Sequence, residues 1–196
     1  MWLPDLRRPA APRGAAGPRR KILVVNGHPD PRPERFCAAL CAAYAAGADS
    51  VGWETRQLNL GGLAFCGAAP GDSGSAPSDL PKDLHDAVET VCWADGLAIV
   101  FPLWLDRPPA PLCRLFEHAA SRPRRSRTAR IVVTMEMPAF AHRSICRDEN
   151  TSDVARSLSL RDVAADQPTF IGSVHMISPE RRAHWLRTLH ASGIRG

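Results

Sequence analysis

Continuous apolar runs alternate along this chain with segments in which apolar residues recur at helical spacing. Three runs, Lys21–Asn26, Gly96–Phe101 and Ala129–Met135, are apolar almost throughout, which is typical of parallel strands buried on both faces. The stretch Trp53–Leu60 is polar in its first half and suits an edge strand, and Thr169–His175 fits a fifth strand. The pattern therefore predicts five strands, with Gly96–Phe101 as the central one.

Helical spacing fills the intervals between these strands. Helices are predicted from about Glu34 to Gly47, from Pro81 to Trp93, through Leu112, Leu115, Phe116 and Ala119, and after the cap Ser178-Pro179-Glu180. In the first of these helices, the spacing allows one face to be formed by Phe36, Leu40, Ala43 and Tyr44. The pattern is weakest between Ala139 and Ala165, where Asp153–Leu160 is compatible with a short helix. The residues of Gly61–Pro81 predict a long surface loop.

This order of elements defines an α/β fold class. Strands separated by helical crossovers form a doubly wound parallel sheet with helices on both faces, and the five-stranded version has the strand order 2-1-3-4-5. In that architecture ligands bind at the carboxyl ends of strands one, three and four, where the winding direction reverses. The three loops that follow these strands are therefore the first places to look for a functional site.

Composition separates a short tail from this domain. Residues 1–20 are rich in Pro, Arg, Ala and Gly and contain too little apolar surface to offset the entropy of ordering them. The whole chain has 196 residues, which is enough for one sizeable core and too few for two. We therefore expect a disordered basic tail over 1–20 and a single domain over 21–196.

The formal charge of +5 does not by itself indicate nucleic-acid binding. The arginines concentrate in the tail and in one connection, Arg122–Arg130, and a single tyrosine leaves little aromatic surface beside them. We expect no specific nucleic-acid partner. No apolar run reaches the length of a membrane span, and the first twenty residues lack the apolar centre of a signal peptide, so we expect a cytoplasmic protein without a membrane span.

Cysteines and histidines give no metal signature. The six cysteines and seven histidines include no C-x-x-C pair and no H-E-x-x-H, so we expect neither a metal site nor a disulfide framework. Cys37 and Cys41 are four residues apart and share a helical face, where small core residues are the default interpretation.

The stretch Lys21–Leu40 has the order strand, loop, helix, which builds an anion site. A loop ahead of a helix presents backbone N–H groups and the positive end of the helix dipole, which suits a phosphate. His28 follows the strand directly, and Arg35 stands near the start of the helix. Neither G-x-G-x-x-G nor a Walker loop is present, and an ordinary crossover without a ligand explains the stretch equally well.

Two further loops lie at the same edge of the predicted sheet. Pro102-Leu103-Trp104-Leu105 follows the third strand, and Thr134-Met135-Glu136-Met137-Pro138 follows the fourth. A flat heteroaromatic ring fits between these loops while its phosphate tail reaches the first loop, and a flavin has this shape. Trp104 has a second interpretation, in which it fills the core beneath the third helix.

Four stretches of the chain, taken together and in order, carry a resemblance to a known family. They are G-H-P-D-P followed by R-F-C-A-A-L (Gly27–Leu40), W-A-D-G-L-A-I-V-F-P-L-W (Trp93–Trp104), V-T-M-E-M-P-A-F (Val133–Phe140), and I-G-S-V with S-P-E-R-R-A-H-W-L (Ile171–Leu186). With these motifs the chain resembles the flavodoxin-like NAD(P)H quinone oxidoreductases, including bacterial NAD(P)H-dependent oxidoreductases. The resemblance implies a flavodoxin-like, flavin-binding domain over 21–196.

The resemblance also implies a cofactor, a reaction and an assembly. FMN or FAD would be held on its phosphate side by His28, Arg35, Phe36 and Cys37, along the ring by Pro102, Leu103, Trp104 and Leu105, and at the ring's other contacts by Thr134, Met135 and Glu136. NAD(P)H would reduce the flavin, and a quinone-like acceptor would then take two electrons in the same pocket. The family resemblance further implies a homodimer.

The chain differs from the family pattern in four places. After Trp104 it has L-D-R-P-P, where the family usually continues with an aromatic residue or glycine and then a small residue. Before the fourth predicted strand it has only S-R-P-R-R-S-R-T, where family members carry a loop rich in glycine and aromatic residues that helps to wall the quinone pocket. Glu136 stands where the family has glycine, and a negative charge there opposes flavin reduction. His142 corresponds to a tyrosine implicated in proton transfer; histidine, with a pKa near 6.5, suits that catalytic role, but an exposed loop histidine is an equal interpretation.

These differences leave a second function open beside the flavin-dependent enzyme. In it, the chain is a degenerate flavodoxin-fold protein without productive flavin binding, acting as an interaction or regulatory subunit. A simple flavodoxin-like electron carrier is less favoured, because the Ser/Thr-rich phosphate loop of flavodoxins is absent.

Overall fold

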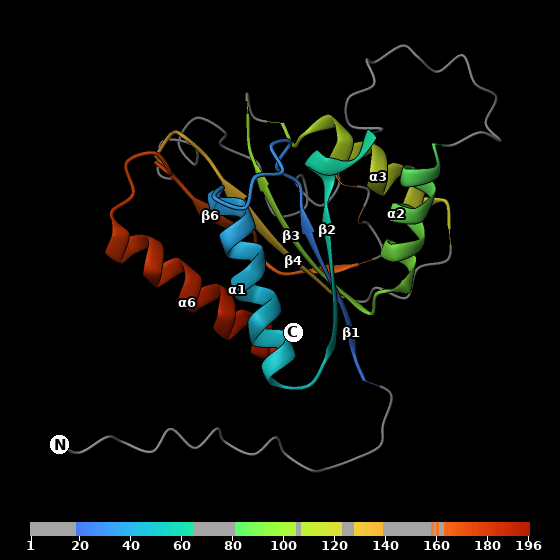
Figure 1. Cartoon of the computed structure of the whole chain (residues 1–196), viewed down its shortest axis with the longest axis horizontal. Helices are drawn as coiled ribbons and strands as arrows, with labels where there is room; N and C mark the ends of the chain where they lie inside the picture. Colours follow the sequence, from blue (N-terminus) through green and yellow to red (C-terminus); the bar gives the residue numbers. More distant parts are fainter. Residues whose placement is uncertain are drawn as a thin grey trace.

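The computed structural model describes residues 19–64, 81–104, 107–122, 128–138, 158, 160 and 163–196. These residues form a parallel sheet with α1 and α6 on one face and α2 and α3 on the other (Figure 1). The elements are β1 (Lys21–Asn26), α1 (Phe36–Ser50), β2 (Glu54–Asn59), the 3-10 turn η1 (Leu60–Gly62), α2 (Lys82–Trp93), β3 (Gly96–Pro102), α3 (Ala110–Ala120), β4 (Thr128–Thr134), β5 (Ala164–Ala165), β6 (Thr169–Ile171) and α6 (Pro179–Arg195).

The sheet topology confirms the predicted architecture. Its strands follow the order β2-β1-β3-β4-β5, with β6 also paired to β4, and every pair is parallel. Every residue of β3 is buried, as expected for the central strand, whereas no residue of β2 is fully buried, as expected at an edge. The winding direction reverses between β1 and β3, so the carboxyl ends of these strands lie at the expected ligand edge.

The far edge of the sheet is the part of the fold that the sequence pattern predicted wrongly. Instead of one strand over Thr169–His175, two short strands pair with β4 in series, β5 near its start and β6 near its end. β6 ends at Ile171, and the strand cannot extend to His175 because Ser173 has a φ of 55°, in the left-handed region that an extended strand does not use. Of the short helix considered for Asp153–Leu160, only Leu158 and Leu160 lie among the described residues, and both are buried.

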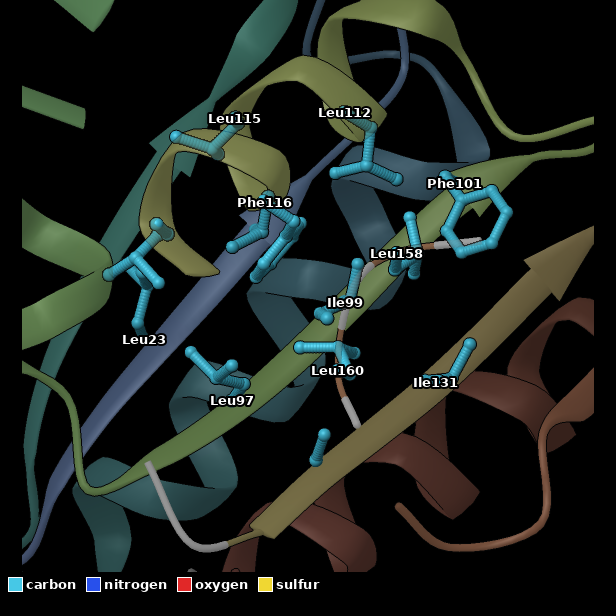
Figure 2. Packing of buried hydrophobic residues seen from close by; sticks show 14 of the residues in the cluster. Leu23, Leu97, Ile99, Phe101, Leu112, Leu115, Phe116, Ile131, Leu158 and Leu160 are labelled. Carbon is cyan, nitrogen blue, oxygen red and sulfur yellow. The ribbon is translucent and has the colours of Figure 1, made fainter. Parts of the chain in front are cut away.

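Alternate residues of the central strands point into two separate cores. On the side of α2 and α3, the labelled side chains in Figure 2 form one cluster, which includes Leu23, Leu97, Ile99, Phe101, Leu112, Leu115, Phe116, Ile131, Leu158 and Leu160. On the side of α1 and α6, smaller residues predominate, among them Val24, Ala98, Val100 and Val132. This period of two places the inner strands between two apolar layers, which explains their continuous apolar sequence.

The backbones of α1 and α6 touch at two glycines. A Cβ added to Gly47 would lie 2.0 Å from the carbonyl oxygen of His190, and one added to Gly193 would lie 2.1 Å from that of Tyr44. The prediction that α1 ends near Gly47 was therefore wrong, since the helix continues to Ser50 and Gly47 serves the helix crossing. Leu40 and Tyr44 are buried as expected, and so are Cys37 and Cys41, which confirms their interpretation as core residues.

The described residues lack the features of two other kinds of site. No helix in this part of the chain combines the length and apolarity needed to cross a membrane. The same residues contain no group of three or more His, Cys, Asp or Glu side chains arranged to hold a metal ion.

Candidate functional site

Three loops meet at the carboxyl edge of the sheet because backbone hydrogen bonds continue past the strands. Gly27 N–H donates to the Val100 carbonyl at 2.8 Å, and Leu103 N–H donates to the Thr134 carbonyl at 2.8 Å. Met135 N–H donates in turn to the Ile171 carbonyl at 2.9 Å. The loops that follow β1, β3 and β4 are therefore held in one row, as the topology predicts.

Asn26, the last residue of β1, anchors the β1–α1 loop. The residue is only 2 % exposed, its Oδ1 accepts the His28 N–H at 3.1 Å, and its Nδ2 donates to Asn59 Oδ1 at 3.2 Å. Both polar ends of the amide are satisfied, which is the condition for burying such a group. Sequence reasoning did not single out Asn26; the available signal was a lone amide at the end of an apolar strand.

Asn26→Ala is expected to lower the free energy of unfolding by about 1–3 kcal/mol, because the His28 N–H and the Asn59 carboxamide lose a buried partner. Chemical denaturation followed by circular dichroism measures this difference. Asn59→Ala is the comparison: it removes only the acceptor of Asn26 Nδ2 and keeps the bond from the His28 N–H, so it should cost less than Asn26→Ala. Equal losses for the two variants would contradict the anchoring role of Asn26.

His28 is held as a neutral imidazole. Its Nδ1 accepts the Asp30 N–H at 2.9 Å, and because a backbone N–H can only donate, the ring proton belongs on Nε2. The Asp30 carbonyl oxygen also lies 3.2 Å from Nδ1, but a hydrogen bond to it would need a proton on Nδ1. The Asp30 N–H, which can only donate, therefore decides the tautomer. Burial, and secondarily the charge of Arg35, lowers the pKa of His28. The ring meets Trp104 edge to face, with centroids 6.0 Å apart.

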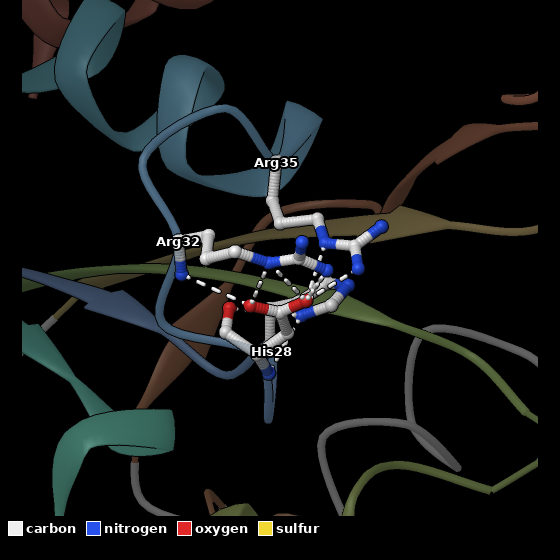
Figure 3. Close-up of polar contacts among 4 residues, drawn as sticks. His28, Arg32 and Arg35 are labelled. Carbon is white, nitrogen blue, oxygen red and sulfur yellow. Dashed lines mark hydrogen bonds and ion pairs between the residues drawn. The ribbon is translucent and has the colours of Figure 1, made fainter.

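Asp30 binds both arginines of this loop (Figure 3). Its Oδ2 accepts Arg32 Nη2 at 2.6 Å, Arg32 Nε at 3.0 Å and Arg35 Nε at 2.7 Å, and it also pairs with Arg35 Nη2. Its Oδ1 accepts the Arg32 N–H at 3.1 Å. The hydrogen bonds from Arg32, followed by those from Arg35, hold the pKa of Asp30 well below its usual range. The Asp30 side chain is therefore an ionised carboxylate at neutral pH, bound within its own loop.

Most backbone N–H groups of this loop are bound within the protein, which differs from the expectation based on the sequence. Acceptors within the protein bind the N–H groups of Gly27, His28, Asp30, Arg32 and Arg35, and no N–H exists at Pro29, Pro31 and Pro33. The loop was expected to present free N–H groups, but it satisfies most of them itself. Arg35 is the N-cap of α1, and among the described residues no side chain caps the first turn of that helix. That turn and the Arg35 guanidinium are the groups placed to receive an anion.

The loop after β3 presents an exposed indole. Pro102 ends the strand and is buried, and Leu103 is also buried. Trp104 is 48 % exposed, and its backbone exchanges two hydrogen bonds with that of Arg107. The interpretation of Trp104 as core beneath α3 is therefore wrong. Leu105, predicted to line a ring site, lies outside the described residues.

The loop after β4 turns its polar side chain outward. Thr134 and Met135 are buried, whereas the Glu136 side chain is 68 % exposed and pairs with His175 Nε2 at 3.0 Å. Two backbone bonds, from Val174 N–H to the Met135 carbonyl and from Ser173 N–H to the Met137 carbonyl, hold this loop against the segment after β6. The partnership of Glu136 with His175 joins positions far apart in sequence and had no sequence signal.

The first turn of α1 contributes a buried thiol. Cys37 Sγ lies 3.3 Å from the Thr134 hydroxyl, and burial raises the pKa of Cys37 to about 11. At neutral pH it is an uncharged thiol with little nucleophilic character. The ring of Phe36 is partly buried and lies 5.0 Å from the Arg182 guanidinium.

The structure thus brings most of the predicted residues to one edge, in two groups. Trp104, His28 and Arg35 form a contiguous chain through Asp30, a residue that sequence reasoning did not select. Cys37 and Thr134 form a second, buried contact. His142, the predicted catalytic residue, lies outside the described residues.

Known proteins with the same fold include several reductases. An NAD(P)H:quinone oxidoreductase from Methanothermobacter marburgensis superposes with a TM-score of 0.69 at 18% identity, covering 91% of this chain and 97% of its own. An NADPH-quinone reductase from P. pentosaceus gives 0.60 at 12% identity, covering 89% and 97%. An azoreductase from Bacillus anthracis gives 0.60 at 13% identity, covering 90% and 100%. At these identities the likeness establishes the fold alone.

Sequence comparison gives the family directly. No protein with a curated description matches the sequence. The sequence model of the Flavodoxin_2 family, described as having the flavodoxin-like fold, matches residues 20–159, which include β1, β3, β4 and the three loops at their carboxyl ends. The chain therefore belongs to the Flavodoxin_2 family.

Proposed function

We propose that this protein is a flavin-dependent NAD(P)H oxidoreductase that passes two electrons from NAD(P)H through bound FMN or FAD to a quinone-like acceptor. The observation that carries the proposal is the single row of groups at the carboxyl edge: Arg35 stands at the start of α1, and His28, linked to it through Asp30, meets the exposed Trp104 indole. The names of similar folds support it, since they include quinone reductases, an azoreductase and an NADH:FMN oxidoreductase.

The residues of this edge fit the phosphate end of a flavin. Arg35 and the backbone of the first turn of α1 would bind the phosphate, as an anion at a helix N-terminus requires. The side chains of Cys37 and Thr134 contact each other in the interior, so these two residues would contribute through their backbone atoms. His28 and Phe36 would border the phosphate side without adding charge, because His28 is neutral.

The ring end would lie between the loops after β3 and β4. Pro102, Leu103, Trp104 and Leu105 would border one part of the ring, and Thr134, Met135 and Glu136 another. When bound, the flavin supplies the chemistry, accepting a hydride from NAD(P)H and passing both electrons to the acceptor. The protein binds, orients and shields the ring, and we propose His142 as the group that supplies a proton to the acceptor. A homodimeric, cytoplasmic protein belongs to the same proposal.

The visible absorption spectrum of the purified protein tests this function. It should be recorded before and after incubation with excess FMN or FAD and removal of free flavin. We expect a retained flavin spectrum that bleaches when NADH or NADPH is added without oxygen and returns when a soluble benzoquinone is added. A protein that retains neither flavin would overturn the proposal.

One observation favours the second function, a degenerate flavodoxin-fold subunit that does not use flavin. The arginines and most N–H groups of the β1–α1 loop already have partners within the protein. Under this alternative the protein stays colourless after incubation with either flavin, and its role would lie in binding another protein. The same absorption experiment therefore separates the two functions.

Glu136 provides a test of the ring end. Glu136→Gln is expected to tighten FMN binding by about twofold to fivefold, because it removes an exposed negative charge from the loop beside the proposed ring site. Quenching of flavin fluorescence measures the affinity. His175→Gln is the control, since it replaces the imidazole that contacts Glu136 but keeps the carboxylate, and it should not tighten binding. Unchanged affinity in Glu136→Gln would show that this charge lies away from the ring.

A further inference from the structure

The arginines of the β1–α1 loop offer the same edge to one carboxylate. Arg32 and Arg35 each bring their Nε and Nη2 to Asp30 Oδ2. This edge of a guanidinium is one that binds two oxygens of a phosphate in parallel. Asp30 therefore occupies, with its Oδ2, both hydrogen-bonding positions that a phosphate would use on Arg35 (Figure 3).

We infer that Asp30 is an internal anion that a phosphate-bearing ligand must displace from Arg35, which makes Asp30 a residue that sets the selectivity of this site between phosphorylated and unphosphorylated ligands. The identity of the ligand as a flavin rests on the proposed function. The exchange of one anion for another rests only on the loop itself.

The surroundings of the ion pairs permit such an exchange. The side chains of Asp30 and Arg35 retain 24% and 41% of their exposed area, so both can move without opening the core. His28 binds the backbone N–H of Asp30 and not its carboxylate, so the main chain of the loop stays held when the carboxylate leaves. Displacement therefore changes side-chain partners and leaves the fold in place.

The alternative role for Asp30 would be to orient the arginines for a phosphate bound beside it. Two features oppose that role. The carboxylate is anionic and would stand next to a dianionic phosphate, and like charges at short range repel. In addition, most of the loop N–H groups that a second anion would need already have acceptors, among them those of Gly27, His28 and Arg32. A site built for two anions would keep such donors open.

Asp30→Asn in the full chain tests the inference. The variant keeps an oxygen that can accept the Arg32 N–H, so the turn is retained, while the competing charge is lost. Calorimetric titration with pyrophosphate is expected to show about fivefold tighter binding than in the wild type, the upper range for release of one exposed ion pair. FMN should bind tighter by a similar factor. Riboflavin, which has no phosphate, should bind equally to both proteins.

Glu34→Gln is the matched control. Glu34 is an exposed carboxylate of the same loop, so its replacement changes the net charge by the same amount. It should alter pyrophosphate binding much less than Asp30→Asn does. An equal gain in the two variants would overturn the inference, because the effect would then be one of net charge.

Other outcomes also decide the matter. Weaker or unchanged pyrophosphate binding in a folded Asp30→Asn protein, or no binding to either protein, would overturn the inference. If pyrophosphate binds more tightly to Asp30→Asn while FMN binds to neither protein, the inference stands and the proposed flavin function fails. A gain of equal size for riboflavin would also overturn it, since the phosphate would then not be the group that competes with Asp30.

Discussion

Gly47→Ala is expected to lower the free energy of unfolding by about 2 kcal/mol. The added Cβ would lie 2.0 Å from the His190 carbonyl oxygen, a backbone atom that moves only if the whole of α6 moves. Overpacking of this kind costs about 3 kcal/mol at the upper end of its range. Alanine favours a helix over glycine by about 1 kcal/mol, so the net loss is smaller than the clash alone. Urea denaturation followed by circular dichroism measures the difference.

The chain offers a matched control for this prediction. A Cβ at Gly62 would meet nothing within 4 Å among the described residues, so Gly62→Ala should change stability by no more than about 0.5 kcal/mol. Gly193→Ala disturbs the same helix crossing from the other side and should behave like Gly47→Ala. Combining the two should cost less than the sum, because the first substitution already separates the helices. Equal stability of the Gly47 and Gly62 variants would contradict the close crossing of α1 and α6.

Arg35→Met is expected to weaken FMN binding by about tenfold or more, and to leave riboflavin binding unchanged. Methionine keeps an unbranched apolar stem but removes the guanidinium at the N-cap of α1, where a charged hydrogen bond contributes about 1.5–3 kcal/mol. Fluorescence quenching of the two flavins gives both affinities, and thermal unfolding verifies that the variant is folded.

Arg32→Met is the control for the phosphate site. Arg32 binds the same carboxylate, but its side chain is more exposed than that of Arg35, 65% against 41%. It also precedes the N-cap of α1, so a smaller loss of FMN affinity is expected. If riboflavin binding falls as much as FMN binding in Arg35→Met, the arginine supports the loop and does not contact a phosphate.

The two carboxylates of the proposed flavin site are treated differently by the fold. Asp30 is bound by two arginines within its own loop, whereas Glu136 is paired with His175 from the segment that follows β6. The first pairing engages groups that a phosphate needs, and the second draws the Glu136 side chain towards an exposed histidine. Removal of the Asp30 charge should therefore affect the phosphate end of a bound flavin, and removal of the Glu136 charge should affect the ring end. Riboflavin, which has no phosphate, should respond only to the second change.

The apolar pattern of the sequence was sufficient to predict the sheet except at its far edge, where β5 and β6 replace one expected strand. β1 begins and ends at the predicted residues, β3 is one residue longer at its end, and β4 is shifted by one residue at both ends. A strand buried on both faces must be apolar at every position, and a helix must repeat its apolar residues every three or four, so both signals are local. The alternation of these signals then leaves few possible topologies, which is why the strand order and the three ligand loops were also predictable.

Only the tertiary structure decided which groups within those loops interact. Sequence reasoning placed His28, Arg35 and Trp104 at the site, but it did not find Asp30 as the link between His28 and Arg35 or Asn26 as the anchor of His28. It also took Gly47 for the end of α1, because a glycine that ends a helix and one that admits another helix look alike in sequence. Periodicity records which face of an element is apolar, whereas the partner of a carboxylate or the approach of two backbones depends on distances between segments that the chain brings together only on folding.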